Sequence, residues 1–336
     1  MAKQKKALLL GGTGALGVYL TPSLLKMGYK VDVVSLDDKE SNDPSLTFIK
    51  ADVKNLDFLK EQLKNDYSAI VDFMLYFSKE EFANYYKLYL QNTDHYVFLS
   101  SYRIYADSKT PITEESPRLL EVATDPVFRT SGDYALYKAE QEDMLRQSGY
   151  SNWTILRPTI TYSKDRFQLV TLEARVLVYR MLRGMTVVLP EPALNIMGTL
   201  SWAGDFGTMV SRLVQNPNAM KETYTIGTAE HYTWGEIAEI YKELGGLRYV
   251  TTDTESFLKI LNPDVPLYSR QQLTYDRYFN RAIDNTKILN ATGLKQSDLM
   301  PLRKGLAMEL SGVPRDAKWE DFGANERMDR LLKIMK

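Results

Sequence analysis

Short apolar runs alternate along the chain with longer segments whose apolar residues recur at helical spacing. The short runs predict strands of a buried parallel sheet, and the longer periodic segments predict amphipathic helices. Because strand and helix follow one another in regular order, we expect βαβ units and a doubly wound parallel sheet of the α/β class. The predicted strands cover residues 7–10, 31–36, 47–49, 69–73, 96–100, 154–157, 186–189 and 223–226. The predicted helices cover residues 14–27, 56–65, 79–91, 133–147, 169–183, 206–214 and 234–244.

Beyond residue 245 the pattern loosens. Prolines punctuate this part of the chain, which predicts a smaller, mixed C-terminal lobe. We expect residues 1–163 with 199–240 to form the sheet domain, and residues 164–198 with 241–336 to form a substrate-binding lobe. That lobe should cover the carboxyl ends of the strands, where open α/β sheets bind their ligands.

A glycine turn follows the first predicted strand, with three glycines at three-residue spacing before the first helix. In a Rossmann-type nucleotide-binding domain the first glycine permits a tight turn, the second lets the backbone approach a pyrophosphate, and the third lets the helix pack closely on the strand. The segment therefore predicts an NAD(P) site, with a glycine-rich loop that binds nothing as the alternative. The predicted cofactor contacts are Gly11, Thr13, Gly14, Ala15, Leu16 and Gly17.

The composition narrows the function classes. The 336 residues are 44% hydrophobic and carry a formal net charge of -1, which suits a soluble enzyme and argues against a general nucleic-acid binder. The chain has no cysteine, which excludes disulfides and thiolate chemistry and fits a cytoplasmic protein. Its two histidines, His95 and His231, lie far apart, so no metal site is expected. No segment approaches the roughly 20 apolar residues of a membrane span, so no membrane association is expected.

Tyr134 and Lys138 stand four residues apart in a predicted helix, so their side chains lie on one helical face. A free phenol has a pKa of about 10, and lowering it to about 7 for work as a base takes about 4 kcal/mol. An adjacent ammonium group and a cationic nicotinamide would supply that stabilisation. Tyr105 and Lys109 have the same spacing, but they lie in a turn before Pro111, where four residues do not share a face.

Several motifs occur together in a characteristic order. They are Gly11-x-x-Gly14-x-x-Gly17, Ser101 four residues before Tyr105, Thr113-Glu114-x-x-Pro117, Tyr134-x-x-x-Lys138 and Leu156-Arg157-Pro158. With these motifs the chain resembles an extended short-chain dehydrogenase/reductase of the NAD-dependent epimerase/dehydratase family. The resemblance spans most of residues 5–245.

The resemblance implies three catalytic residues. Ser101 would polarise the reacting oxygen, Tyr134 would be the general acid/base, and Lys138 would hold the nicotinamide ribose and lower the pKa of Tyr134. The cofactor would also contact Tyr134, Lys138, Pro158 and Thr159. In the alternative interpretation Ser101 only ends a strand, Tyr134 packs in the interior and Lys138 is solvated.

The resemblance also bears on the choice of cofactor. At the end of the second strand, where NAD-binding relatives carry an acidic residue, this chain has Ser35, followed by Asp37 and a second aspartate. The acidic pair would repel a 2'-phosphate, so NAD is expected, with NADP possible. Asp52 and Val53 follow the third strand, where members of the family contact the adenine, although an aspartate here also suits a turn.

The substrate residues depart from the family pattern. Sugar-nucleotide members carry Asn-x-Tyr-Gly where this chain has Ile-Thr-Tyr-Ser at 160–163, and the usual arginine before Asp205 is missing. Two arginines of the C-terminal lobe could replace a diphosphate clamp, or could make interlobe salt bridges. Bulky residues at 73–76 should narrow the pocket. The predicted substrate contacts are Tyr76, Tyr105, Tyr162, Arg270 and Arg277.

Two functions fit these observations. One is an NAD(P)-dependent epimerase/dehydratase-type oxidoreductase that takes a hydride from a carbinol of a sugar nucleotide or related polyol; epimerase, dehydratase and simple dehydrogenase remain open. The other is a non-catalytic NAD(P)-binding protein, regulatory or RNA-associated. The intact set of Ser101, Tyr134 and Lys138 favours the enzyme, and the lack of a basic stripe weighs against RNA. The predicted helices at 79–91 and 133–147 would pair in a homodimer, or else belong to the core.

Overall fold

A computed structural model describes residues 5–164 and 166–335 of the chain. Its central sheet has seven strands in the order β13-β6-β5-β4-β1-β2-β3, and every pairing is parallel. The chain first builds outward from β1 to β3 and then returns to the other side of β1, so the strand order reverses between β1 and β4. Open α/β sheets bind ligands beside such a reversal. The strands are β1 (Lys6–Leu10), β2 (Lys30–Ser35), β3 (Leu46–Lys50), β4 (Ala69–Asp72), β5 (Tyr96–Leu99), β6 (Trp153–Pro158) and β13 (Glu222–Ile226).

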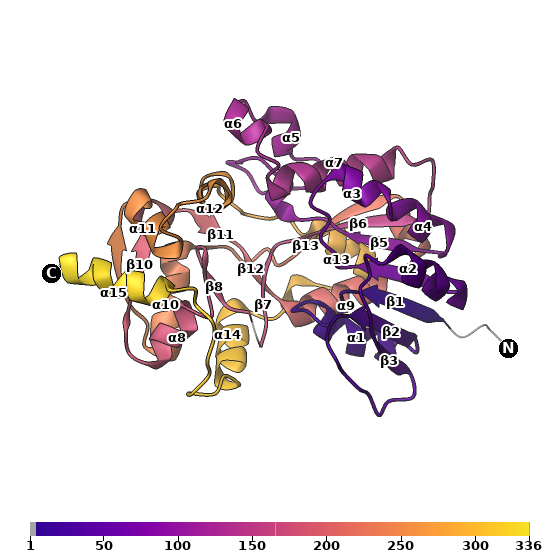
Figure 1. The fold of residues 1–336 in the computed structure, drawn as a ribbon, viewed down its shortest axis with the longest axis horizontal. Helices are drawn as coiled ribbons and strands as arrows, with labels where there is room; N and C mark the ends of the chain where they lie inside the picture. The colour runs from indigo at the N-terminus through magenta and orange to yellow at the C-terminus, as the bar shows by residue number, and fades with distance from the viewer. Residues whose placement is uncertain (1–4, 165, 336) are drawn as a thin grey trace.

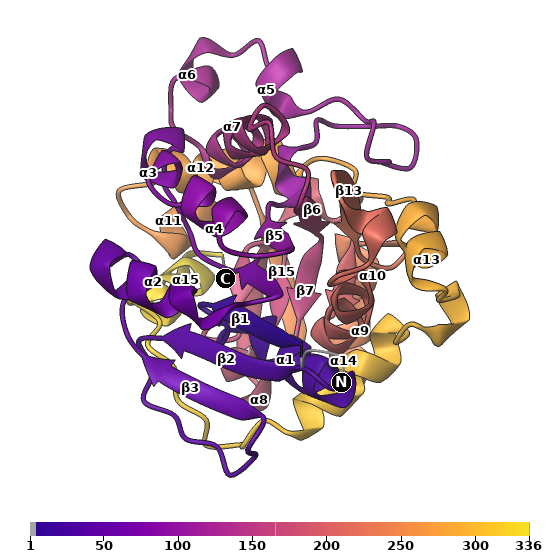
Figure 2. The same ribbon diagram turned by 90° about the vertical axis from the view of Figure 1, so that its right-hand side faces the viewer.

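Helices cover both faces of this sheet (Figure 2). Successive residues of β1 point to opposite faces, so Ala7 and Leu9 join one apolar cluster while Leu8 and Leu10 join another. The first cluster is completed by α1 (Gly17–Lys26), α9 (Ala203–Leu213) and α13 (Thr286–Thr292). The second is completed by α2 (Leu56–Gln62), α3 (Lys79–Ala83), α4 (Tyr86–Gln91) and α7 (Tyr134–Arg146).

A smaller lobe lies beside the sheet domain, at the left of Figure 1. It has its own apolar core, to which its short parallel pair of strands contributes Val187, Val188 and Leu189. Its elements are β10 (Thr186–Pro190), β15 (Arg248–Thr252), α8 (Leu177–Leu182), α10 (Trp234–Gly245), α11 (Thr254–Leu261), α12 (Leu267–Gln272), α14 (Leu302–Ser311) and α15 (Ala324–Ile334).

Short elements connect the two parts. A single π-helical turn, Leu273–Arg277, follows α12. The other short elements are β7 (Ile160–Tyr162) with β12 (Leu200–Trp202), β11 (Met197–Gly198) with β14 (Tyr232–Thr233), β8 (Gln168–Leu169) with β9 (Leu172–Glu173), α5 (Leu119–Val122) and α6 (Pro126–Arg129).

The doubly wound α/β sheet is confirmed, with local corrections. The helix predicted over 169–183 is wrong at its start, because Leu169 and Leu172 pair in the β8–β9 hairpin and Val170 between them has a φ of 54°. The Val170 carbonyl accepts a hydrogen bond from Arg277 Nε at 2.8 Å, a tertiary contact that helical periodicity does not encode. The helix predicted over 79–91 is divided into α3 and α4.

Two helices lie on the other side of the predicted domain boundary. The apolar residues of α10, including Trp234 and Ile237, belong to the core of the lobe, although most of this helix was assigned to the sheet domain. In contrast, α13 packs against α9 and β13 of the sheet, and Ile288 is buried there. Both helices are amphipathic, and periodicity shows which face is buried without showing the partner.

Candidate functional site

The glycine turn joins β1 to α1 at the carboxyl edge of the sheet. Gly11 has a φ of +73°, a conformation that glycine adopts without strain, and its amide donates to the Val34 carbonyl at 2.8 Å. At Gly17 an added Cβ would lie 2.1 Å from the Gly12 carbonyl oxygen, so only glycine lets α1 pack this closely on the turn. At Gly14 an added Cβ would meet nothing nearer than the Gly11 carbonyl oxygen at 4.0 Å. Packing within the chain therefore gives no reason for glycine at this position.

This turn fits the diphosphate of a dinucleotide. Among the described residues no side chain caps the N-terminus of α1, and the first turn of that helix carries no acidic residue. This end of the helix thus favours an anion through the helix dipole, while the Val18 and Tyr19 amides already donate to the Gly14 and Leu16 carbonyls at 3.1 Å. Gly14 is exposed at this end, with Thr13 and Ala15 partly exposed. A side chain at Gly14 would fill the space that the anion needs.

The ends of β2 and β3 lie next to this turn. The Ser35 hydroxyl accepts a hydrogen bond from the Asp37 amide at 3.1 Å, and the Asp52 carboxylate accepts one from the Lys54 amide at 2.9 Å. Both contacts form local turns, and the carboxylates of Asp37 and Asp52 stay exposed while Val53 is buried. The edge expected to face an adenosine ribose therefore carries negative charge.

A cavity of about 340 Å³ opens beyond the glycine turn, between the sheet and the lobe. Ser101 follows β5 and Tyr134 begins α7, and both side chains line this cavity together with Leu16 from the turn. The structure thus places the predicted serine and tyrosine on the same side of the sheet. The described lining residues are Leu16, Leu75, Leu99, Ser100, Ser101, Tyr102, Arg103, Tyr134, Pro158, Thr159, Ile160, Thr161, Arg166, Gln168, Glu173, Gln272 and Arg277.

The electrostatic neighbour of Tyr134 is an arginine. Burial raises the pKa of the Tyr134 phenol, while the Arg103 guanidinium, a hydrogen bond with Ser101 and the nearby Arg166 act in the opposite direction. The guanidinium carbon of Arg103 lies 5.2 Å from the centre of the Tyr134 ring. A cation in this position stabilises a phenolate, which is the state that a tyrosine base requires.

Lys138 is not among the described residues that line the cavity. Its ammonium donates to the Leu99 carbonyl at 2.8 Å and lies 4.6 Å from the centre of the Phe98 ring, and the residue is buried. Burial lowers the pKa of Lys138 to about 8, while the carboxylates of Asp72 and Glu142 oppose that shift. Tyr134 and Lys138 both belong to α7, and the cations that counteract the effect of burial on the pKa of Tyr134 are Arg103 and Arg166.

Four of the five predicted substrate contacts lie elsewhere. Tyr76 and Tyr105 are buried, with their hydroxyls bonded to Tyr89 at 2.9 Å and to Thr225 at 2.7 Å. Tyr162 is also buried, and its hydroxyl would collide with a side chain at position 305 of α14, which is on the lobe side of β7. Arg270 is exposed on the lobe, where it pairs with Glu255. None of these four side chains lines the cavity, so the structure does not bring them together with Ser101 and Tyr134.

Arg277 lines the cavity, as predicted, and two further arginines join it there. No motif in the sequence marks Arg103 or Arg166 as a site residue. Arg103 stands two residues after Ser101, and this position just past the end of a strand was the available signal. Arg166 follows β7 in the same way, but neither residue belongs to a recognisable spacing pattern.

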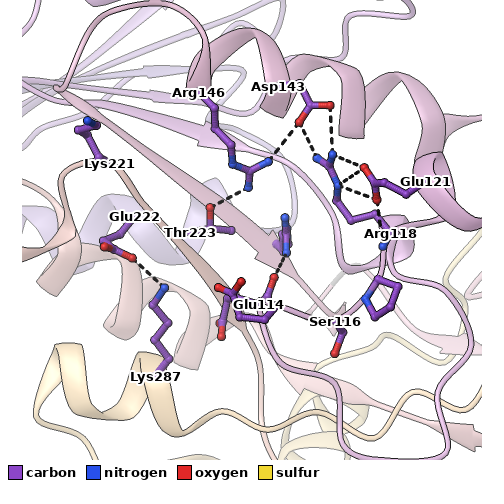
Figure 3. A pocket seen from close by; sticks show the side chains of 13 residues that line it. Glu114, Ser116, Arg118, Glu121, Asp143, Arg146, Lys221, Glu222, Thr223 and Lys287 are labelled. Carbon is purple, nitrogen blue, oxygen red and sulfur yellow. Dashed lines mark hydrogen bonds and ion pairs between the residues drawn. The ribbon is translucent and has the colours of Figure 1, made fainter.

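A buried ion pair between α7 and β6 ties that helix to the sheet. The guanidinium of Arg157 on β6 donates to both carboxylate oxygens of Glu142 on α7, at 2.9 and 2.7 Å. A cavity of about 490 Å³ lies next to this pair and is lined by residues that neutralise one another. Figure 3 shows the side chains of this cavity, where Arg146 contacts Asp143 and Thr223 while Lys287 pairs with Glu222. This network supports the site by fixing α7, which carries Tyr134.

Two kinds of feature are absent from the described residues. None of their helices is long and apolar enough to cross a membrane. Over the same residues no group of three or more histidine, aspartate or glutamate side chains is arranged to hold a metal ion.

Residues 7–227 match the NAD dependent epimerase/dehydratase family. A curated relative, the chloroplast stem-loop binding protein of 41 kDa b of Arabidopsis thaliana, is 25% identical over 259 residues. This match covers 73% of the chain but spans only 64% of the length of that relative.

Solved structures of the same fold cover almost the whole chain. A dTDP-glucose 4,6-dehydratase of Bacillus anthracis in complex with NAD superimposes with a TM-score of 0.65 at 19% identity, covering 92% of this chain and 96% of that one. A UDP-glucuronic acid 4-epimerase of Bacillus cereus, in complex with UDP-glucuronic acid and NAD, superimposes with a TM-score of 0.66 at 16% identity. The match covers 91% of this chain and 98% of that one. At these identities the likeness establishes the fold.

Proposed function

Because the chain belongs to the NAD dependent epimerase/dehydratase family, we propose that it is an NAD(P)-dependent enzyme that oxidises a carbinol of a sugar nucleotide or related polyol. One observation carries this proposal: the hydroxyls of Ser101 and Tyr134 share a cavity with Leu16 of the glycine turn. An alcohol held there would lie within reach of both hydroxyls and next to the predicted dinucleotide site. The ligands named for the solved relatives, NAD and UDP-glucuronic acid, support the same assignment.

The residues of this chain would divide the work as follows. The amides at the N-terminus of α1 and the open face of Gly14 would bind the pyrophosphate of the dinucleotide. When bound, the nicotinamide supplies the acceptor for a hydride from the carbinol carbon. Tyr134 would take the hydroxyl proton, and Ser101 would donate a hydrogen bond to the same oxygen. Arg103, stacked on the ring, would stabilise the phenolate form of Tyr134.

The carboxylates of Asp37 and Asp38 favour NAD over NADP. Asp37 is exposed at the end of β2. Asp38 forms an ion pair with Lys50 at 2.9 Å, so the ammonium group of this lysine already has an anionic partner. A 2'-phosphate placed here would meet like charge. Calorimetric titration with each cofactor tests this preference directly.

The test of catalysis is Tyr134→Phe, which removes the proton-transferring group and keeps the ring. With a panel of nucleoside diphosphate sugars, the variant should reduce NAD+ about 10² to 10⁴ times more slowly than the wild type, at nearly unchanged NAD+ affinity. Tyr105→Phe is the matched control. Its hydroxyl is bonded to Arg157 and Thr225 outside the cavity, so this variant should lose stability and keep its turnover. Wild-type turnover in Tyr134→Phe would contradict the proposal.

A non-catalytic, RNA-associated function is the second candidate. The name of the curated relative, a stem-loop binding protein, favours it. A stem-loop RNA titration with a single-stranded control separates the two functions. Submicromolar, stem-loop-specific binding without turnover of any sugar nucleotide would support this candidate over the enzyme.

A further inference from the structure

The wall of the site cavity that faces Tyr134 is unusually rich in guanidinium groups. Arg103, Arg166 and Arg277 line the cavity from three separate segments of the chain. Arg103 stacks on the Tyr134 ring, and both Arg103 and Arg166 act electrostatically on the tyrosine. The cations therefore gather at the reacting end of the cavity.

Carboxylates around this wall only partly neutralise it. Asp276 lies near three guanidiniums at once, at 3.5 Å from those of both Arg103 and Arg281 and in direct contact with that of Arg277. Arg103 also reaches Asp133 at 3.3 Å, yet its buried Nε has no hydrogen-bond partner among the described residues.

Over residues 5–164 and 166–335, Arg166 has the fewest carboxylate partners of the three arginines. Within the described part of the chain, no carboxylate lies within ion-pair distance of its guanidinium. The acidic residue of the same cavity wall, Glu173, is shared with Arg175 at 3.3 Å. Burial lowers the pKa of Arg166, and the neighbouring Arg277 acts in the same direction while Glu173 opposes it. A bound anion would stabilise a buried guanidinium in such surroundings, because it would supply a charge-assisted hydrogen-bond partner.

We infer that this wall is an anion-binding subsite, in which Arg166 and Arg103 recognise a carboxylate or phosphate group close to the reacting carbon of the substrate. The inference rests on the proposed function, because it takes Tyr134 as the acid/base. The anion belongs to the reacting end of the substrate rather than to a distant diphosphate, since the guanidinium carbon of Arg103 lies over the ring of the acid/base itself, 5.2 Å from its centre. The substrate class is then an acidic or phosphorylated sugar derivative.

The experiment compares three ligands that differ at the reacting end. NAD+-loaded protein is titrated calorimetrically with UDP, UDP-glucose and UDP-glucuronate, and separately with malonate and inorganic phosphate. In the wild type, UDP-glucuronate should bind at least about tenfold more tightly than UDP-glucose, as one charge-assisted contact provides. Arg166→Met should abolish this preference, and Arg166→Lys should restore part of it. Arg270→Met is the matched control, because Arg270 pairs with Glu255 outside the cavity, and it should keep the preference.

Each other outcome decides the question. If all three uridine compounds bind equally and weaken equally in Arg166→Met, the arginines hold the diphosphate and the inference is overturned. If no uridine compound binds, the titrations with malonate and inorganic phosphate are compared between the wild type and Arg166→Met. An affinity for either anion that is about tenfold weaker in the variant supports the subsite. An unchanged affinity overturns the inference. Failure of the wild type to bind NAD+ or NADP+ instead refutes the proposed function, whatever the anions do.

Discussion

Adding one methyl group at each of two glycines three residues apart should separate folding from cofactor binding. At Gly17 the new Cβ would lie 2.1 Å from the Gly12 carbonyl oxygen, which is about 1 Å nearer than an ordinary contact permits. Relieving this overlap requires a backbone shift, and such overpacking costs about 1–3 kcal/mol. At about 2–4 °C per kcal/mol for a domain of this size, Gly17→Ala should lower Tm by roughly 3–10 °C.

The same change at Gly14 should leave the fold intact. Its Cβ would meet nothing nearer than 4.0 Å, and replacing a compatible glycine restricts the unfolded chain, so Tm should stay level or rise slightly. NAD+ affinity should nevertheless fall at least about tenfold, or about 1.4 kcal/mol, because the methyl occupies space at the N-terminal end of α1, which no side chain of the described residues caps. Gly14→Val should abolish binding.

Scanning calorimetry and NAD+ titration of the two alanine variants provide the readouts. Equal thermal destabilisation by both variants would show that Gly14 is packed as closely as Gly17. Unchanged NAD+ and NADP+ affinity in Gly14→Val would remove the pyrophosphate from this turn and would refute the cofactor assignment.

Two further predictions concern the buried charges that support the site. The pKa of Lys138 is lowered from 10.5 to about 8 by burial, so the folded chain binds fewer protons than the unfolded chain between these values, and wild-type stability should rise with pH across this window. Urea titrations give the free energy of unfolding of the wild type and of Lys138→Met at each pH. Between pH 7 and pH 10.5 the wild-type value should rise by about 3 kcal/mol relative to that of the variant. A difference that does not change with pH would contradict the burial of a charged lysine. Arg157→Met should cost about 3–5 kcal/mol at neutral pH, since it removes the main partner of the buried Glu142 carboxylate. That cost should shrink as acid protonates Glu142, and an equal cost at pH 4 and pH 7 would assign the loss to packing.

The parts of the site that the sequence predicts well are those governed by strand ends. Ser101 follows β5 and Tyr134 begins the helix that leads to the neighbouring strand β6, so parallel topology alone brings both to one edge of the sheet. The glycine turn is predictable for the same reason, because its spacing encodes a backbone geometry rather than a side-chain contact. Arg103 and Arg166 were missed because no periodicity or spacing marks a residue in a connection.

Side-chain direction explains most of the corrections. Tyr76, Tyr105 and Tyr162 all lie near strand ends, so topology places their backbones close to the site. Each ring nevertheless turns into the interior, where burying an aromatic side chain is favourable and its hydroxyl at positions 76 and 105 finds a partner. The π-helical turn at Leu273–Arg277 has the opposite effect: it brings Asp276 and Arg277 to the cavity from a segment with no regular pattern.

The pairing of Tyr134 with Lys138 shows what helical spacing does and does not determine. A separation of four residues places two side chains on one face, but one turn of helix separates them along the axis, and that distance is enough to give them different surroundings. Here Tyr134 opens to the cavity, while Lys138 meets the Leu99 carbonyl and the carboxylate field of Asp72 below it. A buried ammonium held by these groups contributes to the local field without being the nearest cation to the phenol. The position nearest the phenol belongs to Arg103, whose guanidinium stays charged at any pH at which the protein is folded, so the support it gives Tyr134 does not titrate with the reaction.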